Sequence, residues 1–284
     1  MKHISNHEHT TKVHYDSLTD LENDTFPNKR NEDLWSSYLR EGGGESWWGW
    51  SGGFDNLKRL MSTGWKTGAM KIEENLKILD LPIVMGVRRK RKRGAFGDSI
   101  DMQSVYAGSL DRAWETTERV RSTNTGTNNA VVIVEVAVAS RVGSHEAFWR
   151  GAAAVAVTDM LQRSGRSVML VVVTSNVKMD IDNRNAVYSH SITVKDFDQP
   201  LDTEHAALLT STGFYRGYMF KAKFLSDCRA SDSLGEPVKY KIIPDFVEEQ
   251  GYDHFYIDGN VLSLGRAKDY VNSVFERITR QEVA

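Results

Sequence analysis

The chain has 284 residues, with 40% apolar and 26% charged side chains and a formal net charge of −2. This length suits one large domain, or one domain with a smaller appendage. No stretch approaches the roughly 18 consecutive apolar residues of a membrane-spanning helix, which argues against a membrane protein. The single cysteine, Cys228, excludes an internal disulfide, and the first residues lack the layout of a secretory signal. We therefore expect a cytoplasmic protein.

Residues 1–33 are polar, rich in histidine and poor in large apolar side chains. This composition predicts a weakly ordered N-terminal arm. His7, His9 and His14 could bind a metal ion, but their spacing matches no common ligand set. We expect them to be solvent-exposed imidazoles.

Residues 34–129 are predicted to form a helical region. Apolar residues recur at helical spacing over residues 55–79, and Gly64 and Gly68 predict a division into two helices. Residues 100–121 predict a further amphipathic helix. The composition of the segment that follows predicts a loop.

The pattern changes at Ala130, after which residues 131–140 form an almost continuous β-branched run. Such a run is typical of a strand covered on both faces. Residues 145–165 predict a helix that Ser144 caps and Gly165 ends, and residues 167–176 predict a second buried strand. Strand, helix and strand within about 45 residues indicate a right-handed crossover between parallel strands.

The same alternation continues to the end of the chain. The predicted elements are a strand at 190–197, helical segments broken at Gly213 and Gly217 within 201–225, short strands at 238–243 and 253–259, and a helix at 264–278. Residues 130–284 therefore predict a three-layer α/β domain with a mostly parallel sheet.

Residues 131–173, VVIVEVAVASRVGSHEAFWRGAAAVAVTDMLQRSGRSVMLVVV, resemble the opening of a von Willebrand factor A-like (VWA-like) domain. There, a buried strand leads through a loop into a sheet-covering helix and a second strand. More closely, the layout resembles a family of bacteriophage and phage-associated proteins of unknown function with a degenerate VWA-like half. The resemblance covers roughly residues 47–280, and the matching pieces are WSGGFDNL (50–57), RRKRKRGAFGDSID (88–101), SLDRAW (109–114), HEAFWRGAAAVAVTDML (145–161) and VKDFDQPLD (194–202).

Standard VWA-like domains bind a divalent cation through an Asp-x-Ser-x-Ser loop after the first strand, where oxygen ligands suit Mg²⁺. Two alignments are sensible here, and neither preserves the loop. One places Glu135 first and leaves Ala137 and Ala139 where hydroxyls are needed, and the other ends on Arg141, whose guanidinium repels a metal ion. We expect no metal and no cofactor, and we expect Glu135 to meet a buried partner or to lie at the edge of the sheet.

The carboxyl ends of parallel strands are where an α/β sheet usually binds a ligand. Ser140, Arg141 and Ser175 are the candidates for a strand-end site, although loops at such edges are polar in any case. The sequence shows no Walker-type phosphate loop, no G-x-S-x-G elbow and no H-E-x-x-H pair. With no visible nucleophile–base pair, we expect a non-enzymatic protein.

Six consecutive cations form a basic run: Arg88, Arg89, Lys90, Arg91, Lys92 and Arg93. Their mutual repulsion predicts an extended, solvated loop, and one reading is a face that is merely solvated or neutralised. The functional reading is nucleic-acid binding, because Arg and Lys engage phosphates and release counterions.

Trp47, Trp48 and Trp50 lie between two glycine clusters. In an exposed loop, their rings would offer faces on which unpaired bases stack. The alternative is that they pack the helical region onto the sheet.

Our leading hypothesis from sequence is a non-enzymatic, phage-type accessory protein of transcription or replication in the host cytoplasm. It would bind nucleic acid, preferably single-stranded DNA, through the basic run and the three tryptophans. The rival hypothesis is a protein–protein adaptor on a metal-free VWA-like domain, with the basic run docking an acidic partner. An enzyme using the strand-end edge is the third class.

Overall fold

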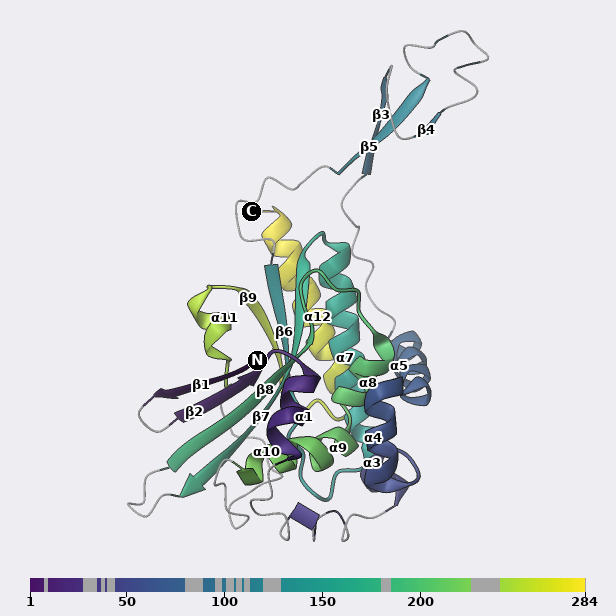
Figure 1. The fold of residues 1–284 in the computed structure, drawn as a ribbon. Helices are drawn as coiled ribbons and strands as arrows, with labels where there is room; N and C mark the ends of the chain where they lie inside the picture. Colours follow the sequence, from purple (N-terminus) through teal and green to yellow (C-terminus); the bar gives the residue numbers. More distant parts are fainter. Residues whose placement is uncertain are drawn as a thin grey trace.

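The structure is a computed structural model whose main element is a six-stranded sheet (Figure 1). The residues that it describes are 1–7, 10–27, 35–36, 39, 44–79, 89–94, 99–100, 105, 109, 113–119, 129–179, 185–225 and 241–283. In spatial order the strands are β1 (Lys2–His7), β2 (Thr10–Tyr15), β8 (Asn185–Lys195), β7 (Ser167–Met179), β6 (Asn129–Glu135) and β9 (Asp253–Ile257). The neighbours β2–β8, β7–β6 and β6–β9 are parallel, and β1–β2 and β8–β7 are antiparallel. The α/β class predicted from sequence is confirmed.

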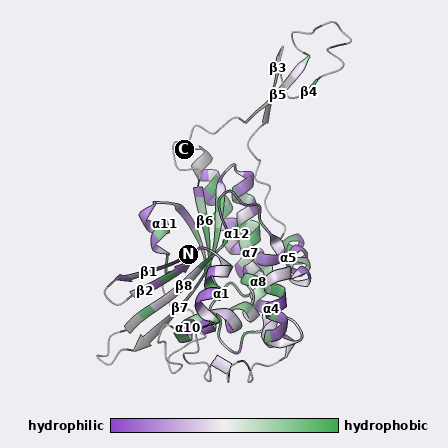
Figure 2. Ribbon diagram, in the orientation of Figure 1, coloured by the Kyte–Doolittle hydropathy of each residue, from purple (hydrophilic) through white to green (hydrophobic). Residues whose placement is uncertain are grey.

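Helix α7 (Ser144–Arg163) connects the parallel strands β6 and β7, so the predicted strand–helix–strand crossover is confirmed. The helix begins one residue earlier than expected, because Gly143 is its N-cap and donates its backbone N–H to Glu146 Oε2 at 2.8 Å. A Cβ atom at Gly151 would lie 2.6 Å from Thr210 Oγ1, so glycine permits a close approach of the neighbouring chain. Apolar residues dominate β6, the first half of β7 and the middle of α7, whereas both ends of α7 carry polar residues (Figure 2).

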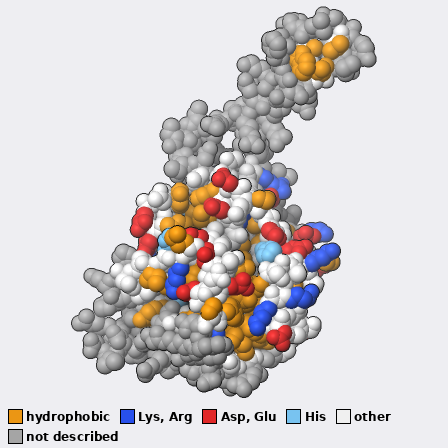
Figure 3. All heavy atoms as spheres, in the orientation of Figure 1, with side chains coloured by type: hydrophobic (Ala, Val, Ile, Leu, Met, Phe, Trp, Pro, Cys, Tyr) orange, Lys and Arg blue, Asp and Glu red, His pale blue; other side chains and the backbone are white. Residues whose placement is uncertain are grey.

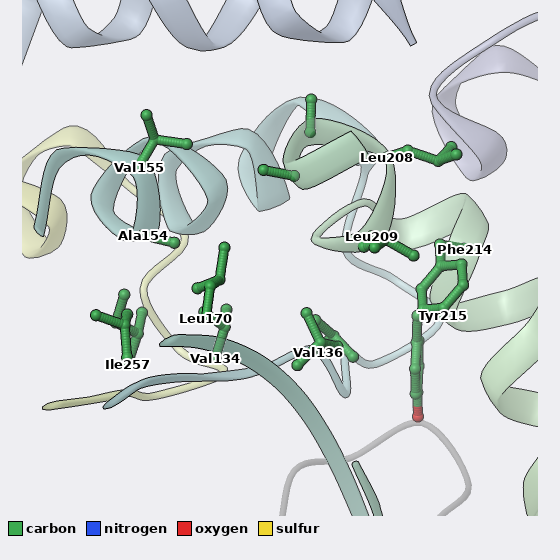
Figure 4. Packing of buried hydrophobic residues seen from close by; sticks show 14 of the residues in the cluster. Val134, Val136, Ala154, Val155, Leu170, Leu208, Leu209, Phe214, Tyr215 and Ile257 are labelled. Carbon is green, nitrogen blue, oxygen red and sulfur yellow. The ribbon is translucent and has the colours of Figure 1, made fainter. Parts of the chain in front are cut away.

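The two faces of the sheet are covered unequally. Most helices lie on one face: α1 (Leu18–Thr25), α3 (Glu45–Trp48), α4 (Gly53–Thr63), α5 (Lys66–Leu79), α7, α8 (Thr203–Leu209), α9 (Thr212–Phe214), a π-helical turn (Tyr215–Met219), α10 (Phe220–Leu225) and α12 (Leu264–Val283) (Figure 1). On this face Val134, Leu170 and Ile257 pack beneath α7 (Figure 4). The opposite face carries the short α11 (Asp245–Glu249), whose Val247 packs on a smaller apolar cluster.

None of the helices in the described part of the chain combines the length and apolar character needed to cross a membrane. The two helices expected over residues 55–79 are present and separate at Gly64, while Gly68 lies inside α5. Residues 241–243, expected to end a short strand, are not in a strand, and residues 238–240 lie outside the described residues.

The N-terminal segment differs from the prediction. Residues 1–33 were expected to form a weakly ordered arm, but β1, β2 and α1 belong to the folded body. Strand β2 alternates in burial, with Val13 and Tyr15 buried on the helical face, and Leu21 of α1 is fully buried. Composition misled the prediction because one apolar side chain every second residue is enough to hold an amphipathic strand.

A second difference concerns residues 100–121, which were expected to form a helix. Residues Trp114–Arg119 form β5, the central strand of a small sheet in the order β3 (Arg89–Gly94), β5, β4 (Ser99–Ile100). Figure 1 draws this sheet apart from the six-stranded one. Cross-strand pairing overrode a helical periodicity that rested on few apolar residues.

The docking of the N-terminal segment can be tested at Leu21. Replacing Leu21 by Ala should lower the free energy of unfolding by about 2–5 kcal/mol, because the truncation leaves a cavity under α1. Denaturant unfolding measures this change. Asn23→Ala on the exposed side of the same helix is the control, and an equally small effect for both variants would contradict the docked arrangement.

Candidate functional site

The basic run is a paired strand and not the solvated loop that was expected. Strand β3 runs antiparallel to β5 in a register that places Arg89 opposite Arg119, Lys90 opposite Glu118, Arg91 opposite Thr117, Lys92 opposite Thr116 and Arg93 opposite Glu115. Arg88 lies outside the described residues. The extended backbone agrees with repulsion among like charges, and the pairing supplies the hydrogen bonds that a free loop would take from water.

In the two-stranded ribbon of β3 and β5, some cations stand opposite an acidic residue and others do not. Its paired residues comprise six cations and two carboxylates, a formal net charge of +4. The two carboxylates stand opposite Lys90 and Arg93, whereas Arg91 and Lys92 stand opposite threonines. The middle of the basic strand therefore has no acidic residue directly across from it on β5.

Two of the three candidate tryptophans are buried. Trp48 and Trp50 are 3% and 6% exposed, and Trp50 Nε1 donates to the carbonyl oxygen of Gly53 at 2.9 Å. The ring of Trp50 meets that of Trp65 edge-on, with 5.0 Å between their centroids. These contacts correspond to the packing alternative. Neither ring is exposed, so neither is available for the expected stacking with bases.

Trp47 is half-buried and covered by an arginine. The guanidinium carbon of Arg216 lies 3.8 Å from the centroid of its ring, an arrangement of the cation–π type. The same guanidinium donates to the carbonyl oxygens of Trp47 at 2.6 Å and of Val142 at 2.8 Å. Arg216 thereby ties α3 to the loop between β6 and α7, which gives Trp47 a structural role.

The expected strand-end residues do not gather into one site. Ser140 and Arg141 are exposed on the loop after β6, whereas Ser175 is fully buried in β7. Ser175 Oγ donates to Glu135 Oε2 at 3.0 Å. Strand β7 continues to Met179, so Ser175 lies inside the strand and not at its expected end, apart from the loop pair.

Glu135 has buried partners, which was one of its two predicted environments. Its carboxylate accepts hydrogen bonds from the backbone of Ala137 at 2.9 Å, from Ser175 and from Tyr256 Oη at 3.2 Å. Burial raises the pKa of Glu135, and the hydrogen bond from Ala137 together with the positive charge of Lys223 acts in the opposite direction. The carboxylate thus finds its hydrogen-bond partners within the fold, which indicates a role in stability more than in catalysis.

A buried arginine lies at the loop after β6, the segment in which a cation-binding loop was sought from the sequence. The fully buried Arg150 donates to the carbonyl oxygens of Val136 at 3.2 Å and of Ala137 at 3.3 Å, immediately after β6. Its positive charge disfavours a cation there. Among the described residues, no group of three or more His, Cys, Asp or Glu side chains is arranged to hold a metal ion.

One feature escaped the sequence analysis. A cavity of about 420 Å³ opens on the α11 face of the sheet and is lined in part by Lys12 and His14 of β2 and by Asp16, which directly follows that strand. His14, expected to be an exposed imidazole, has only 14% of its side chain exposed. The signal was the alternation of polar Lys12, His14 and Asp16 with apolar Val13 and Tyr15, which marks a strand with two different faces.

Comparison with known proteins places the chain in a family. A family model described as Domain of unknown function (DUF7192) matches residues 3–280, so the chain belongs to that family. No curated protein and no solved structure matches it. The family carries no assigned activity, and the phage and VWA-like parts of the resemblance remain predictions.

A buried histidine beside the Glu135 cluster allows a test by pH. Burial and the charge of Lys223 lower the pKa of His190 from 6.5 to about 3, so the folded protein holds this side chain neutral. The unfolded chain takes up the proton first, so His190 costs stability as the pH falls below 6.5. Between pH 7 and pH 4.5 this cost is about 2–3 kcal/mol.

We therefore expect His190→Gln to lose less unfolding free energy than the unchanged protein over that pH range. Denaturant unfolding at several pH values measures the difference in slope. His145→Gln, the same substitution at an exposed histidine, provides the control. Identical slopes for all three proteins would show that His190 is not buried in its neutral form.

Proposed function

We propose that this protein binds nucleic acid through the ribbon of β3 and β5. The observation that carries the proposal is the register, which concentrates a formal charge of +4 on one short ribbon in a chain of net charge −2. Phosphates of a nucleic acid match such a ribbon because each neutralised phosphate releases counterions.

The described part of the six-stranded body offers no comparable concentration of charge on the side that Figure 3 shows. Lysines and arginines of α4 and α5 are there interspersed with acidic side chains (Figure 3). Strand β3 is also an edge strand of its small sheet, with β5 as its only described neighbour. An edge strand presents backbone donors and charged side chains to a partner.

The tryptophans no longer support a stacking contribution. Trp48 and Trp50 are buried, and Arg216 covers Trp47, so we assign binding to phosphate contacts. Single-stranded DNA remains the expected ligand, and duplex DNA is the matched comparison. We assign binding alone to the ribbon and no reaction.

The wider role that we propose is that of an accessory factor in transcription or replication, phage-encoded and acting in the host cytoplasm. Its scaffold would be a metal-free VWA-like domain. What supports the scaffold is the succession of a buried strand, β6, a loop, the sheet-covering helix α7 and a second buried strand, β7. The basic run and WSGGFDNL (50–57) are the pieces that support the phage family.

The register supplies a sharp test with two matched double variants. Arg91→Gln with Lys92→Gln removes the two cations that face threonines, and Lys90→Gln with Arg93→Gln removes the two that face carboxylates. Both variants lose the same charge. The first should weaken DNA binding at least 10-fold and flatten the dependence of log Kd on log salt by about 2. The second should have a smaller effect, because each of its cations stands opposite a glutamate in the register.

Fluorescence anisotropy measures both quantities, with single-stranded and duplex DNA at 50 and 200 mM salt. Between these salt concentrations, affinity that depends on phosphate contacts changes steeply. Binding that ignores salt and both variants would contradict the proposal. A protein partner recovered after nuclease treatment, with no measurable DNA binding, would favour the adaptor with an acidic partner.

A further inference from the structure

The cavity on the α11 face brings together residues that are far apart in the chain. Strand β2 pairs with β8 in parallel, and the register places His14 beside Ser191. His14 Nδ1 lies 2.9 Å from Ser191 Oγ, and both residues line the cavity of about 420 Å³. A serine and a histidine at this distance, next to an open cavity, have the geometry of a nucleophile and its general base.

The second nitrogen of the imidazole also has neighbours. His14 Nε2 lies 3.3 Å from Thr193 Oγ1 and 3.7 Å from Asp16 Oδ1. When Nε2 carries the hydrogen and faces these oxygens, Nδ1 is free to accept the hydroxyl hydrogen of Ser191. In the opposite tautomer, Ser191 Oγ would instead donate to the carbonyl oxygen of Val13, at a longer 3.4 Å.

The surroundings of His14 keep its imidazole neutral. The ring packs against Phe246 of α11 with 4.6 Å between centroids, and burial lowers the pKa of His14 to about 4. Asp16 raises this pKa, and His3 lowers it. A neutral imidazole at physiological pH is the form that accepts a proton.

We propose that this cavity is an acyl-transfer site in which Ser191 is the nucleophile and His14 the general base, acting on small esters that carry a positive charge. The site lies on the six-stranded body and is independent of DNA binding by the ribbon. It departs from the expectation of a non-enzymatic protein, because the nucleophile–base pair that the sequence did not reveal is formed across two strands.

The chemistry balances with water as the only co-reactant. Ser191 Oγ attacks the ester carbonyl carbon while its proton passes to His14 Nδ1, and the imidazolium then protonates the departing alkoxide as the ester C–O bond breaks. Water attacks the resulting acyl-serine, giving a proton to His14 that returns to Ser191 Oγ. The carboxylic acid leaves, and the site is restored.

The charges at the cavity select the substrate class. Four carboxylates line it, those of Asp16, Asp196, Asp245 and Glu249, against a single lysine. That lysine, Lys12, is already bound to Asp245, with Nζ 2.6 Å from Oδ1. The excess of negative charge favours a cationic group, and Phe246 with Met169 offers an apolar wall. A cavity of this volume fits a small molecule and excludes a folded polymer.

A fluorophosphonate probe tests the nucleophile directly in the full-length chain. We expect the probe to label Ser191, with the modified peptide identified by mass spectrometry, and we expect Ser191→Ala to abolish that label. His14→Gln should slow labelling at least 100-fold, because the base is lost while the serine remains. Ser189→Ala is the matched control, a buried serine of the same strand that does not line the cavity.

The role of Asp16 needs a readout that a structural role would not move. Asp16→Asn should shift the midpoint of the pH–labelling profile to lower pH, because the carboxylate raises the pKa of His14. The other charged or titratable groups at the cavity stay in place in this variant: His3 of β1, Lys12 of β2, Asp196, Asp245 and Glu249 of α11, and the amino group of Met1 near Asp16. An unchanged midpoint would remove Asp16 from the mechanism.

The substrate class is tested with two alkyl acetates of matched shape and leaving group, cationic acetylcholine and neutral 3,3-dimethylbutyl acetate. The proposal expects the higher kcat/KM for the cationic ester and expects Asp196→Asn to reduce that preference. Equal labelling of the unchanged protein and Ser191→Ala would overturn the nucleophile. An equal or higher kcat/KM for the neutral ester would overturn the substrate class.

Discussion

The fold depends on one helix that is buried on nearly all sides. Helix α7 packs on β6 and β7 with one side and meets α5, α8 and α12 with the others. It can do so because its middle carries only small or β-branched side chains, Gly151 to Thr158, which are all buried. A helix segment that is apolar all round is stable only inside a protein, so the sheet and the surrounding helices must all cover α7.

Because α7 and its neighbours cover the middle of the sheet, polar groups lie at its two ends and edges. Beyond the carboxyl end of β6, the chain turns around Arg150 and Arg216, which hold it through backbone carbonyl oxygens. Those guanidinium groups fix the loop that follows β6 through these contacts. The two features to which we assign binding partners lie elsewhere, in the ribbon of β3 and β5 and in the cavity beside β2.

The central part of the fold could be predicted from sequence for a physical reason. Strands β6 and β7 are buried on both faces, so their β-branched runs stand out, and α12 shows a clear apolar stripe. Segments with only one buried face were harder to predict from the sequence. β2 hides two apolar residues in a polar stretch, and β5 has a short sequence, WETTER, that fits a helix or a strand until pairing with β3 decides.

A candidate site could be predicted from the sequence only where its charged residues are adjacent in the chain. The basic run is visible in the sequence, but the carboxylates opposite it come from a strand more than twenty residues later. The pair of His14 and Ser191 joins residues 177 positions apart and leaves no local motif. Trp48 and Trp50 misled the prediction because glycine-rich flanks indicate a loop but do not show that the loop is buried.

The most direct measurement of the central claim is hydrogen–deuterium exchange of the full chain with and without single-stranded DNA. We predict slower exchange of backbone amides in residues 89–94 and 114–119 when DNA is bound, with the six-stranded body unchanged. Slower exchange confined to the body, with the ribbon unaffected, would contradict it.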